Sequence, residues 1–434
     1  MEFFLLLAIS LAFAARSGVR LIVRRFPHPA DLASLSTFYY GVPLAAAAYA
    51  SYNYHGLVFL SPEAADPGLA LTSMRYVVIA MICLELGCYL GRLLGEPRLL
   101  FYANITGATQ FRTAIWFPAL FAMLGIGIFL FGWNEFRSGY ASEVSGLLPT
   151  IGNGLIFSAT ELLGLVIMVT LILGQRFGRV PLKVLIIAAL GVLIFVLAFR
   201  AKRLEVVTAL MPAALVLFSS RSWISTPWAR MTLGGCALLG LVLVSTFRVS
   251  DQVSLENLGF YTMTEGVYAG HSLPGIENRL EAGYIGYEYG ARFLFSVVSF
   301  VPRIFWESKD ELLKAGNDAL DGVSPLGATN FLAETVLQGG VIAVVLVFTA
   351  LGLLCQRSTN FERIWDKAIA NGFLPLRFGL YVVVTAILIP HFRDGIVPSV
   401  KLALQALLFL ILIVGIHFVG RIKSRHRPKV APAL

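Results

Sequence analysis

The sequence has few charged residues, and only one of its segments is both long and polar. Of its 434 residues, 14% are Asp, Glu, Lys or Arg, whereas 57% are hydrophobic. No water-soluble fold can bury that much apolar surface, and apolar runs of about 20 residues recur from end to end. The composition excludes a soluble enzyme and predicts an all-α polytopic integral membrane protein.

Cysteine and histidine are also scarce. All four cysteines lie within apolar runs, and the six histidines are scattered along the chain. The sequence contains neither a Gly-rich phosphate-binding loop nor a Gly-x-Ser-x-Gly nucleophile motif. We therefore expect no disulfide framework, no metal site, no cofactor and no ATP-driven transport by this chain alone.

The apolar runs predict about eleven spans in a single transmembrane domain, residues 1–434. A net charge of +9 is compatible with binding to nucleic acid. The basic residues lie in short segments between spans, as the positive-inside rule expects of cytoplasmic loops, so we expect no nucleic-acid partner. The expected spans are about 1–15, 35–60, 72–91, 113–132, 152–174, 182–199, 204–219, 231–247, 329–355, 373–390 and 398–419.

Basic and acidic segments alternate between the first spans. A segment with four arginines follows the first span, an acidic turn follows the second, and the third and fifth spans again end in basic segments. This alternation predicts that the N-terminus lies outside the cytoplasm and that the basic C-terminal tail lies in it.

Residues 249–328 form the only long polar segment, predicted as a large outer loop. Between Asp251 and Asp321 it holds eleven acidic and five basic residues, with aromatic residues throughout. Its apolar stretch, about 291–302, is too short to cross the hydrocarbon core and ends at Pro302. We expect a short interfacial or re-entrant helix here, in a loop that carries function.

One turn departs from the charge rule. Between the sixth and seventh spans, Arg200, Lys202 and Arg203 crowd a turn that the topology places outside. Either the span count is wrong by one, or these cations are kept outside to bind an anion. Arg forks bind phosphate oxygens bidentately and Lys adds a point charge, so the second explanation points to a diphosphate.

Other charged residues extend this hypothesis. Arg393 and Asp394 share the last outer turn, where they form either an anion site or a local salt bridge. Arg292 and Arg303 flank the short apolar helix, and either points into a cavity or reaches the lipid headgroups. Glu334, near the outer end of its span, either faces a cavity or has a structural role.

These residues resemble the Wzy-type O-antigen and exopolysaccharide repeat-unit polymerases. The resemblance is carried by the basic outer turn, by Arg393-Asp394, and by the late loop with its Pro-Arg-x-x-Trp-x-x-Lys stretch ending in Lys309. Arg279 and Gly290 match the Arg-x(10)-Gly spacing of some members. Asp310 follows Lys309 where members often have Pro. The resemblance covers about residues 180–400.

The resemblance implies an enzyme of the bacterial inner membrane, multi-pass, with its site on the periplasmic face. It would transfer a growing glycan from undecaprenyl diphosphate to the non-reducing end of a lipid-linked repeat unit, without metal or cofactor. The implied partners are that lipid-linked oligosaccharide, membrane lipids and, as an open question, a chain-length regulator. An O-antigen ligase acting on lipid A core and a non-enzymatic flippase or transporter remain alternatives.

This chemistry needs a base for the acceptor hydroxyl and cations for the departing diphosphate. The candidate bases in the long loop are Glu281, Glu288 and His271, and the sequence does not choose between them. The candidate residues for binding the diphosphate or glycan are Arg200, Lys202, Arg203, Arg279, Arg292, Arg303, Lys309, Arg393 and Asp394.

Overall fold

A computed structural model describes eight long stretches of the chain, all built mainly of helices. Within these stretches there is no β-strand, and four helices are long and apolar enough to cross a membrane: Glu2–Val23, Pro67–Leu93, Leu148–Leu171 and Phe331–Phe361. The chain is therefore a multi-pass membrane protein. The described stretches are 1–50, 66–94, 113–138, 147–174, 203–219, 266–301, 329–362 and 376–425, with a few isolated residues besides.

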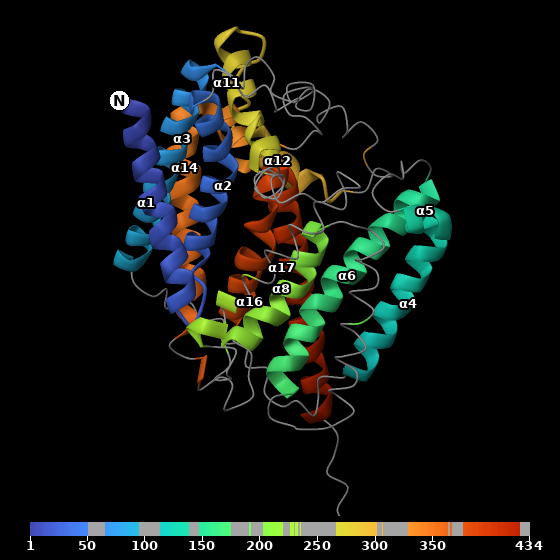
Figure 1. Cartoon of the computed structure of the whole chain (residues 1–434). Coiled ribbons are helices and arrows are strands. Elements are labelled where there is room, and N and C mark those ends of the chain that lie inside the picture. Colours follow the sequence, from blue (N-terminus) through green and yellow to red (C-terminus); the bar gives the residue numbers. More distant parts are fainter. Residues whose placement is uncertain are drawn as a thin grey trace, which may run out of the picture. The chain divides into compact units, whose positions relative to one another are not determined.

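The chain divides into two compact units (Figure 1). The first unit contains α1 (Glu2–Val23), α2 (Pro29–Ala50), α3 (Pro67–Leu93), α11 (Ser272–Glu281), α12 (Ala291–Val298), α14 (Phe331–Ser358), the 3₁₀ turn η7 (Pro390–Asp394) and the start of α17 (Ile396–Arg425). The second contains α4 (Thr113–Phe131), α5 (Trp133–Ser138), α6 (Leu147–Gly174), α8 (Arg203–Ser219), α16 (Leu376–Val382) and the remainder of α17.

In the first unit, α1 and α3 run in the same direction and α2 runs opposite to both. Phe3 at the start of α1 stacks on Tyr49 at the end of α2, with ring centroids 4.0 Å apart. Arg20, in the last turn of α1, contacts Asp31 in the first turn of α2 at 3.3 Å and Glu85 of α3 at 3.1 Å. Only residues 24–28 connect α1 to α2, so the two helices pack as antiparallel neighbours.

Glycines bring α3 and α14 into backbone contact. A Cβ on Gly87 would collide with the carbonyl oxygen of Thr349, and a Cβ on Gly352 would collide with that of Leu84. The thiol of Cys88 also donates to the Gly352 carbonyl at 3.3 Å. Such small-residue interfaces drive helix association in membranes, where packing and not hydrophobicity provides the attraction. Arg92 near the end of α3 contacts Gln356 near the end of α14, so the two helices run parallel.

Arginines gather at one end of this bundle. Arg16 and Arg20 both contact the Glu85 carboxylate, and Arg92 of α3 donates to Gln356 of α14 at 3.1 Å. His28 lies at the same end, where burial and the nearby arginines lower its pKa to about 4. The opposite end carries α11, which packs on α3 and α14 (Figure 1).

Side chains cap the two helices that start at the opposite end. The Asp66 carboxylate accepts a hydrogen bond from Gly68 at 2.7 Å, and Pro67 occupies the first position of α3. The Asn330 side chain accepts from the Ala333 N–H at 2.7 Å to begin α14. Both caps therefore fix where the two longest helices of the unit begin.

The second unit is also held by small residues. Gly152 of α6 lies against the backbone of α4 at Phe131, and Gly164 of α6 lies against the Ala209 carbonyl of α8. Gln405 of α17 donates to Ser158 of α6 at 3.2 Å. The carboxylate of Glu161 is buried in α6, and neither of its oxygens has a hydrogen-bond partner among the described residues.

The helices agree closely with several expected spans. Those expected at 113–132, 204–219 and 329–355 appear as α4, α8 and α14, each within about three residues. The first helix differs, because α1 continues through the arginine segment to Val23, where Glu85 and Asp31 neutralise Arg16 and Arg20. Two short helices, α5 and α11, were not expected. The spans expected at 182–199 and 231–247 fall largely outside the described residues, and the total of eleven stays a prediction.

Candidate functional site

The segment that carries α11 and α12 is fastened to the end of the first unit where α3 and α14 begin. The Asn330 side chain donates to the Ala269 carbonyl at 2.9 Å, and the Asn330 N–H donates to the Ser272 hydroxyl at 3.0 Å. On the other side, the Ser73 hydroxyl of α3 donates to Glu277 at 3.3 Å. This part of the long loop is thus a built portion of the unit.

A buried arginine lies at the start of α12. Gly290, with φ 90°, begins the helix, and Arg292 follows two residues later with only 6% of its side chain exposed. Its Nε lies 2.8 Å from Oε2 of Glu288, and its Nη2 donates to Oε1 of the same carboxylate at 3.1 Å. The guanidinium therefore contacts both oxygens of Glu288, through one charge-assisted hydrogen bond from Nη2 and one ion-pair contact from Nε.

A second carboxylate faces the same guanidinium from α14. Oε1 of Glu334 lies 3.6 Å from Nη1 of Arg292, and Glu334 is fully buried. Its Oε1 accepts from the Thr329 hydroxyl at 2.6 Å, and its Oε2 accepts from the N–H of Ile396 at 2.7 Å. Burial is costly for a charge, and these donors and the arginine supply the compensation that a buried carboxylate needs.

Gln338, one turn after Glu334 on α14, completes the cluster. Its side-chain amide donates to Oε2 of Glu288 at 2.8 Å, and its carbonyl oxygen accepts from the Gly290 N–H at 2.9 Å. The N–H of Glu288 donates to the Leu337 carbonyl at 3.0 Å. We name Glu288, Arg292, Glu334 and Gln338 the Arg292 cluster. Helix α14 therefore holds Glu288 at two points, its backbone N–H through Leu337 and its carboxylate through Gln338.

The helix that supplies this face is kinked just after Gln338. Gly339 and Gly340 leave helical geometry inside α14, with φ 161° and φ 59°, and Gly340 lies beside the hydroxyl of Tyr287. The positive φ at Gly340 favours glycine because a Cβ is disfavoured there. The kink therefore makes room for the loop segment that bears Glu288.

The three candidate bases have different surroundings. Glu288 lies in the Arg292 cluster with 15% of its side chain exposed, whereas Glu281 is exposed at the end of α11 and His271 is 1% exposed at its beginning. Only Glu288 is therefore both orientated by neighbouring side chains and open to solvent.

The candidate cations are brought together only in part. Arg279 lies in the last turn of α11, and Arg393 and Asp394 lie in η7, which ends two residues before Ile396, whose N–H donates to Glu334 of the Arg292 cluster. Arg203 begins α8 in the second unit. Four other candidates, Arg200, Lys202, Arg303 and Lys309, lie outside the described residues.

Two residues of the cluster were not among the candidate site residues. Glu334 was noted only as an acid near the end of a span, and Gln338 was not singled out. The available signal was their spacing, because residues four apart lie on one helix face, followed at once by Gly339-Gly340 in an apolar run. Polar residues on one face of a membrane helix mark a functional interior.

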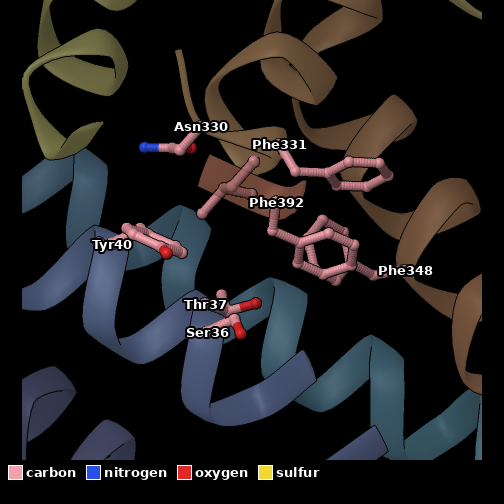
Figure 2. A pocket seen from close by; sticks show the side chains of 9 residues that line it. Ser36, Thr37, Tyr40, Asn330, Phe331, Phe348 and Phe392 are labelled. Carbon is pink, nitrogen blue, oxygen red and sulfur yellow. The ribbon is translucent and has the colours of Figure 1, made fainter. Parts of the chain in front are cut away.

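A small pocket adjoins the same region, between α2, the start of α14 and η7 (Figure 2). Phe331 and Phe392 stack in it with ring centroids 4.4 Å apart, and Tyr40 and Thr37 face them from α2. It has room for about one water molecule, so it does not accommodate a sugar. The described residues contain no group of three His, Cys, Asp or Glu placed to hold a metal ion.

Burial also perturbs an acid on α11. Glu277 is 3% exposed, and burial raises its pKa well above the usual range, an effect that the Ser73 hydrogen bond only partly opposes. Burial therefore favours the protonated form of Glu277. Comparison of the chain with protein-family models, with curated proteins and with solved structures found no match.

Proposed function

We propose that this chain is a polysaccharide polymerase of the bacterial inner membrane. It transfers a growing glycan from undecaprenyl diphosphate to the non-reducing end of a lipid-linked repeat unit. The observation that carries the proposal is Glu288, a partly exposed carboxylate held by Arg292 and Gln338 on a helix of a membrane bundle.

Glu288 serves as the base in this proposal. It takes the proton of the acceptor hydroxyl while the new glycosidic C–O bond forms at the anomeric carbon. The bond from that carbon to the diphosphate breaks at the same time, and undecaprenyl diphosphate leaves with the bonding electrons. A base must be orientated toward the proton it removes, and the two partners of Glu288 provide that orientation.

The acidic residues around Arg292 help to decide which candidate cations bind the diphosphate leaving group. One guanidinium faces the carboxylates of Glu288 and Glu334, so Arg292 already has two acidic partners. We therefore assign Arg292 the positioning of Glu288. The diphosphate is assigned to the remaining candidate cations, Arg200, Lys202, Arg203, Arg279, Arg303, Lys309 and Arg393.

The placement of the arginines supports the sidedness. Arg16, Arg20 and Arg92 lie at one end of the bundle of α1, α2, α3 and α14, and α11 lies at the other. Positive charge is enriched on the cytoplasmic side of membrane proteins, which supports a periplasmic position for α11 and the Arg292 cluster.

The test is complementation of a strain that lacks this gene with Glu288→Gln, which keeps the shape of the side chain and removes the base. We expect the polymer ladder to collapse to single repeats while the lipid-linked repeat unit accumulates. Glu281→Gln, an exposed acid in the same loop, is the matched control and should retain the ladder. Protein levels in the membrane must be equal for both.

Other outcomes assign other functions. A normal ladder with Glu288→Gln contradicts Glu288 as the base. If the strain that lacks the gene makes polymer that stays on undecaprenyl diphosphate and never reaches lipid A core, the protein is a ligase. If the lipid-linked repeat unit of that strain stays on the cytoplasmic face of the membrane, the protein is a flippase.

A further inference from the structure

Three tyrosines project from the segment that joins α11 to α12. Tyr284 and Tyr289 have 81% and 83% of their surface exposed, and Tyr287 has 44%. They lie within six residues that contain no basic side chain, next to exposed or partly exposed carboxylates of Glu281 and Glu288. A soluble loop gains nothing from presenting so many aromatic rings to water, so their role lies in what covers them.

Tyr289 is held in an unfavourable backbone conformation. Its φ of 46° is the only positive φ of a residue other than glycine in the described parts of the chain. Such a conformation costs about 1 kcal/mol or more, and burial of the Tyr289 ring does not repay it, because the ring is exposed. Hydrogen bonds of the neighbours impose it, since Glu288 donates to Leu337 and Gly290 donates to Gln338. The backbone is thus pinned to α14 so that the ring points outward.

Tyr287 is fixed from a different direction. Its hydroxyl lies beside Gly340 at the kink of α14, and its ring meets that of Tyr289 at a centroid distance of 6.2 Å and an interplanar angle of 63°. The two rings therefore form an open corner on a backbone that α14 holds in place. Rigid aromatic surface binds a ligand at little cost in side-chain entropy.

The chemistry of this corner suits a carbohydrate. The faces of a sugar ring carry C–H bonds with partial positive charge, and these stack on the negative face of an aromatic ring. Carboxylates beside the rings accept hydrogen bonds from sugar hydroxyls. Membrane-surface segments instead combine apolar residues with Lys and Arg, and an acidic segment is repelled by anionic headgroups.

We propose that Tyr287 and Tyr289, with Tyr284 beside them, are a stacking platform for the acceptor oligosaccharide. The inference rests on the proposed function and adds to it the binding site of the sugar that is extended. Tyr289 directly follows Glu288 in the chain, so the platform and the proposed base belong to the same short segment.

The first test measures binding without catalysis. The purified full chain in detergent is applied to an array of defined bacterial surface oligosaccharides that carry no lipid and no diphosphate. The wild-type chain should bind a subset of them, and the double variant Y287A/Y289A should lose at least 10-fold in affinity. Y289F and Y289W, which keep a ring, should retain binding. Y89A is the matched control, because Tyr89 of α3 is 58% exposed and remote from the loop.

The second test separates a glycan from a lipid surface. Y289W is reconstituted in vesicles with brominated lipids, with Y89W as the comparison. A glycan-dependent change in the emission of the introduced indole supports the platform. Strong bromine quenching at position 289 without any glycan effect overturns it and identifies a membrane anchor.

The failures of the two proposals are distinguishable. Absence of glycan binding by the wild-type chain, or equal binding by Y287A/Y289A, overturns the platform even if a polymer ladder is made. A wild-type chain that binds glycans but does not restore the ladder overturns the polymerase and leaves the platform standing.

Discussion

The carboxylate of Glu334 accepts a hydrogen bond of 2.7 Å from the backbone N–H of Ile396, 62 residues further along the chain. The same carboxylate lies directly against Gly395, where a Cβ would collide with it. Through this contact the turn that contains Arg393 and Asp394 is fixed to the helix that holds the Arg292 cluster. The turn with Arg393 and the loop with Arg292 thus meet at Glu334, which was not among the candidate site residues.

We expect Gly395→Ala to destabilise this junction. Gly395 has φ 92°, which disfavours any side chain, and the added methyl group would displace Glu334. The expected loss is about 2–4 kcal/mol in the free energy of unfolding, measured by denaturant titration in mixed micelles, together with loss of polymer.

Gly18→Ala is the control for this prediction. Gly18 lies in α1 with nothing near the position of its absent Cβ, so alanine should be neutral or stabilise by about 0.5–1 kcal/mol. Equal stability of Gly395→Ala and wild type would show that Glu334 does not need the close approach of the turn.

A second prediction concerns the interface of α3 and α14. Gly87→Leu should force the helices apart, because the Gly87 Cα faces the Thr349 carbonyl. We expect a loss of about 3 kcal/mol or more, read as a lower melting temperature in detergent. Gly125→Leu, on α4 with open space around it, should change the melting temperature little. The prediction is wrong if the two variants melt alike.

Much of this helical layout can be predicted from the sequence. Apolar runs set the extents of α4, α8 and α14, because a span needs about 20 apolar residues whatever its neighbours are. Capping residues such as Asp66 and Asn330 are also local signals. These features depend on residues close together in the chain.

The candidate site is harder to predict, because its contacts link distant residues. The sequence makes Glu288 and Arg292 candidates but does not reveal that Glu334 and Gln338 contact them, 42 to 50 residues away. Helix α11 was missed because it is short and polar and is held by α3 and α14 rather than by its own periodicity. The remaining cations and the number of spans are still predictions.

The buried acid of α11 gives a third prediction, about pH. Burial raises the pKa of Glu277 above its value in the unfolded chain, so the folded state binds the proton more tightly. The contribution of Glu277 to the free energy of unfolding is fully present at acidic pH. It is lost as the pH rises from about 4.5 through the pKa that Glu277 has in the folded state. Glu277→Gln, which stays neutral, should therefore gain stability over wild type as pH rises.

The measurement is the melting temperature of both forms between pH 4 and 9. The difference between Glu277→Gln and wild type should grow with pH and vanish toward pH 4. Glu281→Gln, which removes an exposed acid four residues away, controls for the change in net charge and should alter the profile much less than Glu277→Gln, since burial is the largest cause of the Glu277 shift. Parallel profiles for Glu277→Gln and wild type would contradict the buried protonated carboxyl.

The last prediction separates the two roles of Arg292. Lysine keeps the charge but has a single ammonium group, so Arg292→Lys cannot hold both oxygens of Glu288 while facing Glu334. We expect a small loss of stability, about 1–2 kcal/mol, and at least a 10-fold fall in kcat in proteoliposomes supplied with lipid-linked repeat units. The KM for the diphosphate-linked donor should change little, because Arg292 is assigned to the base. In the exposed pair Arg75–Glu2 an arginine also contacts both oxygens of a carboxylate, at 2.7 and 3.0 Å, so Arg75→Lys is the control and should leave kcat unchanged. An unchanged kcat with a raised KM for that donor would contradict this assignment and return Arg292 to the diphosphate.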